Sequence, residues 1–401
     1  MPKQTPSRWD SIEKSLVRLI QHEGADQGHP WNVNLLLGTL KQFSRVFRAI
    51  VQARMAFYDL GILRRFPLGC QVISVGNITA GGTGKTPVVE IFARELTAAG
   101  RKVAILSRGY RKKEAPWWRR IGQPLSPPRV VSDGTKVLLD SAMSGDEPYM
   151  LACNLPGVVV LVDKDRVKSG RYAIKHFACD TLILDDGFQY QKLQHQCDVV
   201  LVDRTNPFSN GNMLPRGVLR EPMENLKRAD FIFITKCDGS STDALRSRIR
   251  KFNTSAEITE CCHKPRLLRD AFTREEKPLS ALDGMKVTAL SGIASPGGFE
   301  SSLRSLGATV LACERFVDHH RYTRREIVDV LNHAAELGAD AVITTEKDAV
   351  RLPAIEHPAV PIYFQRIDIE ILRGAENFRQ CVEHICFRKP LGGTDTFISS
   401  R

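Results

Sequence analysis

A glycine-rich run that ends in lysine and threonine is the feature of the sequence with the clearest chemistry. It is GGTGKTP, residues 81–87, and it stands between a β-branched stretch at 71–76 and a helical pattern over 87–99. Backbone N–H groups of such a run can surround phosphate oxygens at a helix start, while the lysine reaches the β- and γ-phosphates and the threonine hydroxyl holds Mg²⁺. The pattern therefore predicts a P-loop for a nucleoside triphosphate.

One departure from the usual G-x-x-x-x-G-K-[ST] spacing is present, because Thr79 occupies the place of the first glycine. The neighbouring pair Gly81-Gly82 would supply the missing backbone freedom. We take the nucleotide-binding segment to be Thr79, Ala80, Gly81, Gly82, Thr83, Gly84, Lys85, Thr86 and Pro87.

Acidic residues follow several apolar stretches and are candidates for metal binding or general base catalysis. Asp185-Asp186-Gly187 ends the strand expected at 181–185, where a P-loop protein holds Mg²⁺, although paired aspartates before glycine also open turns. Asp146 and Glu147 lie in GDEP (145–148), which we expect to be a loop between helical segments. A carboxylate there could accept the proton of a nucleophile.

Further charged residues compete for roles in phosphoryl transfer. Asp163 and Asp165 follow the strand expected at 158–163, and Arg166, Arg216 and Arg220 could neutralise developing charge. Each of these arginines, taken singly, is more often a surface residue. His319 and His320 follow Asp318 in a later loop and could form a carboxylate–histidine pair, although such loops are usually only polar and three ligands would be needed for zinc.

The elements that must position these residues alternate between strand and helix. Short, nearly all-apolar strands are expected over the ranges 71–76, 102–107, 158–163, 181–185, 198–203 and 230–235. Such strands, separated by helices, predict an α/β fold with a mainly parallel sheet. Residues 236–280 are polar and irregular and could link two lobes, and a second α/β unit begins near 285.

Composition narrows the function classes. The chain has 401 residues with 42% hydrophobic and 25% charged residues, which excludes a disordered chain, and its ten cysteines form no CxxC pair. The net charge is +12, with excess lysine and arginine in the stretch 31–66 and in the tryptophan-containing loop 108–120. Such an excess points to nucleic acid, a membrane surface or a phosphorylated substrate.

An amphipathic helix is expected over 31–63, because Leu36, Leu40, Phe43, Phe47 and Ile50 recur at helical spacing. Its basic residues would suit an anionic membrane surface. The pattern alone fits equally a helix packed on the protein's own core, which is the commoner case.

Several motifs in one order resemble the tetraacyldisaccharide 4′-kinases, the lipid A 4′-kinase family of Gram-negative-type bacteria. They are VGNITAGGTGKTP (75–87), SRGY (107–110), VSDG (131–134), GDEP (145–148), DDGFQ (185–189), LREP (219–222), SGIASP (291–296), DHH-x-Y (318–322) and TTEKD (344–348). One departure is Tyr190, where the family usually has histidine after DDGFQ.

The resemblance implies transfer of the ATP γ-phosphoryl group to the 4′-hydroxyl of an anionic glycolipid, tetraacyldisaccharide 1-phosphate. It implies a P-loop core at 71–280, a C-terminal α/β lobe at 281–401 and an N-terminal segment at 1–70 with a membrane-associating helix. The implied catalytic residues are Asp146, His319 and Lys85, with Thr86, Glu147, Asp185 and Asp186 at Mg²⁺ and Arg166 and Arg220 at phosphate or substrate.

The resemblance further implies a peripheral protein at the cytoplasmic face of the bacterial inner membrane. We expect a monomer without a nucleic-acid partner. Two rivals stay open from the residues alone. ITKCD (234–238) resembles a guanine-reading box and would suit a GTP-dependent metallochaperone, and Trp117 with Trp118 could stack on nucleic-acid bases.

Overall fold

The computed structural model describes residues 31–109, 126–356 and 358–387. Residues 1–30 and nearly all of the tryptophan-containing loop lie outside the described residues. The chain forms two compact units. Unit 1 takes in the described residues up to Val103, then Ala178–Cys262 and the described residues from Ile371, and unit 2 takes in the described parts of Ala104–Phe177 and His263–Glu370. The functional division at residues 70 and 280 stays a prediction.

Unit 1 is built on parallel strands in the order β8-β7-β6-β1-β5. Its elements in chain order are α2 (Trp31–Asp59), β1 (Gln71–Asn77), α3 (Lys85–Ala98), β5 (Thr181–Asp185), β6 (Cys197–Asp203), η2 (Met223–Arg228), β7 (Phe231–Thr235), α7 (Asp243–Arg250) and α11 (Ala375–Phe387). The strands β8 (Glu257–Asp270) and β13 (Ile362–Arg373) run from one unit into the other.

Alternating residues of β7 show which helices cover which face of this sheet. Phe231 and Phe233 lie edge-on or tilted near Phe92 of α3 and Phe378 of α11, so these two helices cover one face. Ile232 and Ile234 point the other way, into a buried cluster that includes residues of η2 and α7. β5 and β7 are mostly apolar, as expected of strands whose two faces are both buried.

Unit 2 contains two sets of strands. Its elements in chain order are β2 (Val103–Ser107), β3 (Arg129–Asp133), α4 (Ser141–Ser144), α5 (Asp146–Asn154), β4 (Val159–Val162), α6 (Arg166–Phe177), β9 (Glu276–Pro278), η3 (Leu279–Leu282), β10 (Lys286–Ser291), α8 (Pro296–Ser305), β11 (Thr309–Arg315), α9 (Arg324–Glu336), β12 (Ala341–Thr345) and α10 (Glu346–Ala349). One set has parallel β2 and β4 with antiparallel β3, and the other has parallel strands in the order β11-β10-β12-β13.

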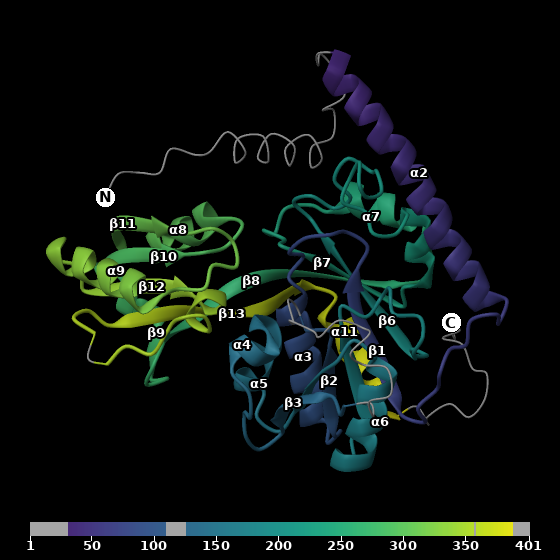
Figure 1. Cartoon of the computed structure of the whole chain (residues 1–401), viewed down its shortest axis with the longest axis horizontal. Helices are drawn as coiled ribbons and strands as arrows, with labels where there is room; N and C mark the ends of the chain where they lie inside the picture. The colour runs from purple at the N-terminus through teal and green to yellow at the C-terminus, as the bar shows by residue number, and fades with distance from the viewer. Residues whose placement is uncertain (1–30, 110–125, 357, 388–401) are drawn as a thin grey trace. The chain divides into compact units, whose positions relative to one another are not determined.

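The second set of strands carries helices on both faces. Val342 of β12 belongs to the cluster that contains the apolar stripe of α9, whereas Ala341 and Ile343 belong to the cluster that contains Phe299 and Leu303 of α8. Figure 1 shows α8 and α9 on either side of β10 and β12. The α/β fold with mainly parallel strands, predicted from the sequence, is confirmed.

The structure departs from the sequence-based expectation in two regions that bear on function. Residues 236–280, expected to be irregular, contain α7 and the 14-residue strand β8. GDEP is not a loop, because Asp146 and Glu147 form the first turn of α5 and only Gly145 separates α5 from α4. The left-handed φ of 96° at Gly145 explains how two helices follow each other so closely.

Helix α2 has one buried face and one exposed apolar face. Leu37, Ser44, Met55 and Tyr58 are buried, and Ser44 Oγ donates to the Met213 carbonyl at 2.7 Å. A separate apolar stripe faces solvent and comprises Leu36, Phe43, Ile50 and Phe57. Figure 1 shows α2 as one long continuous helix. Among the described residues, no helix combines the length and the apolar character needed to span a bilayer.

Candidate active site

The loop between β1 and α3 has the backbone form of a phosphate site. Gly81 and Gly84 have φ of 128° and 82°, values that L-residues with side chains rarely adopt. Helix α3 begins at Lys85, two residues earlier than the sequence predicts, and Pro87 is its third residue. The missing N–H of Pro87 removes no helical bond, because the first four N–H groups have no partner within the helix. Those N–H groups and the helix dipole favour an anion at this end.

Asn77, at the end of β1, organises the side chains of this loop. Its amide donates to Thr79 Oγ1 at 3.3 Å and to Thr83 Oγ1 at 3.0 Å, while its Oδ1 accepts from Lys85 Nζ at 3.4 Å. Thr235, at the end of β7, donates to the Thr83 carbonyl at 2.9 Å. The loop is therefore held from two parallel strands, whose carboxyl ends lie at the same edge of the sheet.

Asp186 lies between two cations. Arg220 donates to both Asp186 oxygens at 2.8 Å, and Lys85 Nζ lies 3.5 Å from Asp186 Oδ1. Burial raises the pKa of Asp186, but the Arg220 hydrogen bonds and the Lys85 charge outweigh burial and hold that pKa well below its usual range. Asp186 is ionised at neutral pH, as a ligand for a cation must be.

The segment around Arg220 pairs with the phosphate loop through its backbone. Ala80 N–H donates to the Val218 carbonyl and Arg220 N–H donates to the Ile78 carbonyl, both at 2.7 Å. The predicted residue Arg220 is thereby brought together with Lys85, Thr86, Asp185 and Asp186 in unit 1. Sequence spacing could not show the backbone pairing, because more than 130 residues separate the two segments.

The oxygen donors near the phosphate loop suit Mg²⁺. Thr86 and Asp185 are buried, Thr86 at the start of α3 and Asp185 at the end of β5, with Asp186 next to it. Mg²⁺ prefers hard oxygen ligands and is commonly held by one or two carboxylates together with substrate phosphates. The described residues contain no cluster of three histidine, cysteine or acidic side chains that could hold a metal alone. The donor set fits a nucleotide-bound Mg²⁺ rather than a resident metal.

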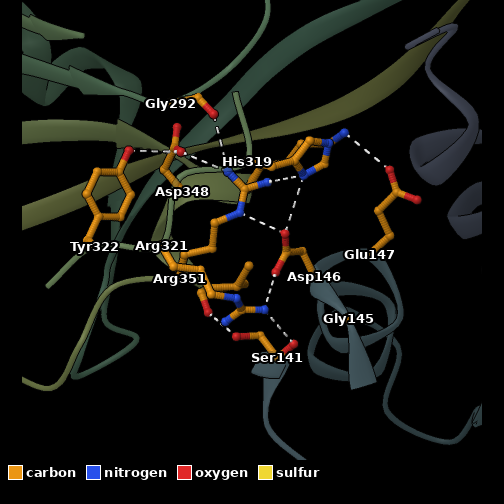
Figure 2. A network of polar contacts seen from close by, with 12 residues as sticks. Ser141, Gly145, Asp146, Glu147, Gly292, His319, Arg321, Tyr322, Asp348 and Arg351 are labelled. Carbon is orange, nitrogen blue, oxygen red and sulfur yellow. Dashed lines mark hydrogen bonds and ion pairs between the residues drawn. The ribbon is translucent and has the colours of Figure 1, made fainter. Parts of the chain in front are cut away.

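A second polar cluster lies in unit 2 and joins Asp146 to His319 (Figure 2). Asp146 Oδ2 lies 3.6 Å from His319 Nδ1, so the structure brings together two of the catalytic residues that the family resemblance implies. Asp146 begins α5, and its side chain is largely buried. His319 has a φ of 62°, which is strained for a residue other than glycine and is a feature of functional sites.

Two arginines that the sequence analysis missed contact the same carboxylate. Arg351 Nε donates to Asp146 Oδ2 at 2.7 Å, and Arg321 donates to Asp146 Oδ1 at 3.2 Å. Arg321 stands inside the DHH-x-Y motif and Arg351 stands three residues after TTEKD. Their proximity to recognised motifs was the available signal, but an arginine in a sequence does not reveal which carboxylate it will meet.

The other predicted residues of unit 2 have contacts of their own. Glu147 pairs with Lys347 at 3.3 Å, and Arg166 is buried and donates to the Lys164 carbonyl at 3.0 Å. His320 contacts Glu326 at 3.2 Å and stacks on Phe316, so its contacts support the start of α9. Glu147 and Arg166 belong to unit 2, whereas the phosphate loop belongs to unit 1.

Asp238 lies in the segment ITKCD, which resembles a guanine-reading box. It accepts from Ser240 N–H at 3.0 Å and pairs with Arg204 at 3.0 Å, and its side chain is 63% exposed. The Ser240 N–H holds the pKa of Asp238 below its usual range. Lys236 is paired with Asp203 at 2.5 Å.

Comparisons with known proteins agree with one another. A family model described as tetraacyldisaccharide-1-P 4′-kinase matches residues 36–386. The tetraacyldisaccharide 4′-kinase of Anaeromyxobacter sp. (strain K) is 43% identical over 334 residues, which cover 82% of this chain and 85% of that protein. The tetraacyldisaccharide 4′-kinase of Syntrophus aciditrophicus (strain SB) is 38% identical over 341 residues, which cover 83% of this chain and 88% of that protein.

A solved structure also resembles the chain. The crystal structure of LpxK from Aquifex aeolicus in complex with ATP superposes with a TM-score of 0.70 at 28% identity, covering 88% of this chain and all of that one. The match to the family model takes in both the phosphate loop and the Asp146–His319 pair, because both lie within residues 36–386.

Proposed function

Because the chain belongs to the tetraacyldisaccharide-1-P 4′-kinase family, it is a kinase of lipid A biosynthesis, and we propose that it phosphorylates the 4′-hydroxyl of tetraacyldisaccharide 1-phosphate with ATP. The observation that carries the proposal is the family match over residues 36–386, which includes both polar clusters described above. The ATP-bound relative supports ATP as the phosphoryl donor.

Unit 1 supplies the nucleotide site in this proposal. Backbone N–H groups from Gly81 to Thr86 surround the phosphates, and Lys85 leaves Asp186 to neutralise the β- and γ-phosphates. Thr86, Asp185 and Asp186 would hold Mg²⁺, and the bound metal would reduce the charge on the phosphates. Arg220 keeps Asp186 compensated while Lys85 contacts phosphate. Arg166 is proposed as a further phosphate or substrate contact.

Unit 2 supplies the general base. Asp146 takes the proton of the 4′-hydroxyl as its oxygen bonds to the γ-phosphorus and the bond from that phosphorus to the ADP oxygen breaks. His319 lies beside Asp146 as the second member of the proposed catalytic pair. The short distance between the two side chains supports this pairing. A positioned general base contributes about 10²–10⁴-fold to the rate of such steps.

The lipid substrate requires a place at a bilayer, and α2 has the surface for one. Phe43 and Ile50 are 65% and 59% exposed on a helix that also carries Lys41, Arg45 and Arg54. Exposed apolar residues beside basic ones suit the headgroup region of an anionic membrane. We infer that the protein is peripheral, with α2 on the cytoplasmic surface of the inner membrane where ATP is available.

The test is direct phosphorylation of the lipid. The purified protein with γ-labelled ATP, Mg²⁺ and tetraacyldisaccharide 1-phosphate in mixed micelles should transfer label to the lipid, and excess GTP should compete poorly. Lys85→Ala should abolish transfer, while Lys102→Ala, an exposed lysine of the same unit, should not. A protein that hydrolyses GTP in preference to ATP and labels no lipid would instead be an NTPase of another class.

A further inference from the structure

Arg351 lies at the centre of the cluster in unit 2 and is almost completely buried. Its side chain is 1% exposed, and the residue follows α10 after Val350. Its guanidinium contacts Asp146 Oδ2 at 2.7 Å, His319 Nδ1 at 3.1 Å, and the Gly292 carbonyl and Asp348 Oδ1 at 3.2 Å each. Figure 2 shows Arg351 reaching between Asp146 and His319.

The contact with His319 determines where the imidazole carries its hydrogen. A guanidinium has N–H donors and no acceptor, so His319 Nδ1 must be the acceptor in this arrangement. The neutral ring then carries its hydrogen on Nε2.

Arg351 is itself held in place by the Asp348 carboxylate and the Gly292 carbonyl. Asp348 is fully buried and accepts from Tyr322 OH at 3.0 Å. Burial and the neighbouring Asp348 carboxylate raise the pKa of Tyr322, so its hydroxyl remains a donor. The Gly292 carbonyl accepts from both Arg351 and the His319 N–H, which joins the guanidinium to the strained backbone of His319.

The two oxygens of Asp146 are held differently. Oδ2 is bound by the buried Arg351, whereas Oδ1 is bound at 3.2 Å by Arg321, whose side chain is 51% exposed. An exposed arginine can leave more readily than a buried one with four contacts. Oδ1 is therefore the oxygen that can exchange its partner for a substrate hydroxyl.

We propose that Arg351 is a positioning residue of the phosphoryl transfer, which fixes the Asp146 carboxylate through Oδ2 and, by its contact with His319 Nδ1, places the hydrogen of the neutral His319 ring on Nε2. The inference rests on the function proposed above for Asp146 and His319. It adds a buried cation that sets the geometry of the base and the tautomer of its partner.

The first test needs no variant. Nitrogen-15 NMR of the full-length protein, with the His319 signals assigned by their loss in His319→Gln, should show neutral His319 with hydrogen on Nε2 and an acceptor at Nδ1. Finding the Nδ1–H tautomer in the unaltered protein would overturn the inference. This result does not depend on activity, so it stays interpretable if the lipid assay fails.

The second test uses kinetics. Arg351→Gln should lower kcat by at least about 10-fold, toward the 10²-fold level of a lost base, with KM for ATP changed less than about twofold. The neutral His319 ring in this variant should shift toward the Nδ1–H form, which can donate to Asp146. Arg351→Lys keeps a donor and the charge, so it should recover part of kcat and keep the fold.

The matched control is another buried arginine of unit 2. Arg366 is 5% exposed, pairs with Glu346 at 2.7 Å and touches neither Asp146 nor His319 in any contact described here. Arg366→Gln should lower stability as a broken buried pair does, while kcat and the His319 tautomer stay unchanged. Equal loss of kcat in Arg366→Gln and Arg351→Gln, or an unchanged tautomer in Arg351→Gln, would reduce Arg351 to a structural residue.

Discussion

Single residues of the phosphate site balance charge before any nucleotide is present. Lys85 and Arg220 both contact Asp186, and Arg220 also contacts the Asn77 side chain. When Lys85 moves to phosphate oxygens, Asp186 keeps the two bonds from Arg220. Asp186 is 34% exposed, so the loss of its cationic partners costs less than it would for a fully buried carboxylate, but it is still unfavourable. Arg220 avoids that cost for nucleotide binding.

This role predicts the effect of changing Arg220. Arg220→Gln should raise KM for ATP by about 10-fold, which corresponds to about 1.4 kcal/mol. Lys85 would then be more firmly tied to Asp186 and less available to phosphate. Initial rates against ATP concentration measure the effect. Arg379→Gln, on an exposed arginine paired with Glu376 in the same unit, should leave KM unchanged. An unchanged KM in Arg220→Gln would show that Lys85 needs no substitute at Asp186.

The sequence predicted the phosphate site well because its chemistry is local. Glycine geometry, a helix start and a lysine lie within one short segment, so residue types and spacing suffice. The base cluster draws on α4–α5, the segment after β10, the segment after β11 and the end of α10. Asp146 and His319 were candidates from residue type alone, their joint catalytic role came from the family resemblance, and Arg351 was missed because its partners are defined by the fold.

At the scale of elements, helix α2 has one apolar face that packs on the core and another that is exposed. The sequence analysis placed Leu36, Phe43, Phe47 and Ile50 on one apolar face, and the structure divides them. Phe47 packs against the buried cluster of unit 1, while Phe43 and Ile50 are exposed. Leu36, Phe43, Ile50 and Phe57 are each seven residues apart, which keeps them in one stripe along the helix. One face of α2 therefore packs on the core, another apolar stripe is exposed within the described residues, and the membrane role of that stripe stays a prediction.

The stripe should bind anionic membranes. Phe43→Glu with Ile50→Glu should reduce co-flotation with vesicles containing phosphatidylglycerol by at least about 10-fold, because each buried apolar side chain is worth about 1.5–3 kcal/mol. Gln42→Glu with Ala49→Glu is the control, since it adds the same charge to exposed positions of the same helix. Equal losses in the two double variants would assign the binding to charge alone. Full retention by the Phe43/Ile50 variant would exclude the stripe as the docking surface.

Strand prediction succeeded where strands are buried on both faces and failed where they are not. β1, β5 and β7 are buried along their whole length and rich in apolar residues, so they stand out in the sequence. β8 alternates between buried and exposed residues and carries many charges, so its 14 residues read as an irregular linker. Its strand form comes from pairing with β7 and β9, which no local pattern encodes.

The whole molecule separates the two halves of the proposed reaction between its units. Every residue proposed to bind phosphate through the P-loop belongs to unit 1, and the Asp146–Arg351–His319 cluster belongs to unit 2. Each unit has its own buried clusters and its own polar network. Since the chain passes between the units several times, each unit is assembled from distant parts of the sequence.

This separation predicts that nucleotide binding and turnover can be lost independently. Asp146→Asn preserves the shape of the side chain and should bind ATP within about twofold of the unaltered protein while turnover falls by about 10²-fold or more. Lys85→Ala should instead weaken ATP binding by at least about 10-fold, because a charge-assisted contact to phosphate contributes about 1.5–3 kcal/mol. Isothermal titration calorimetry with a non-hydrolysable ATP analogue gives the affinities, and the lipid assay gives turnover.

Asp329→Asn, on an exposed position of α9, controls for loss of a carboxylate in unit 2 and should change neither quantity. If Asp146→Asn weakened ATP binding as strongly as Lys85→Ala does, Asp146 would belong to the nucleotide site, and its assignment as the base that acts on the lipid hydroxyl would fail.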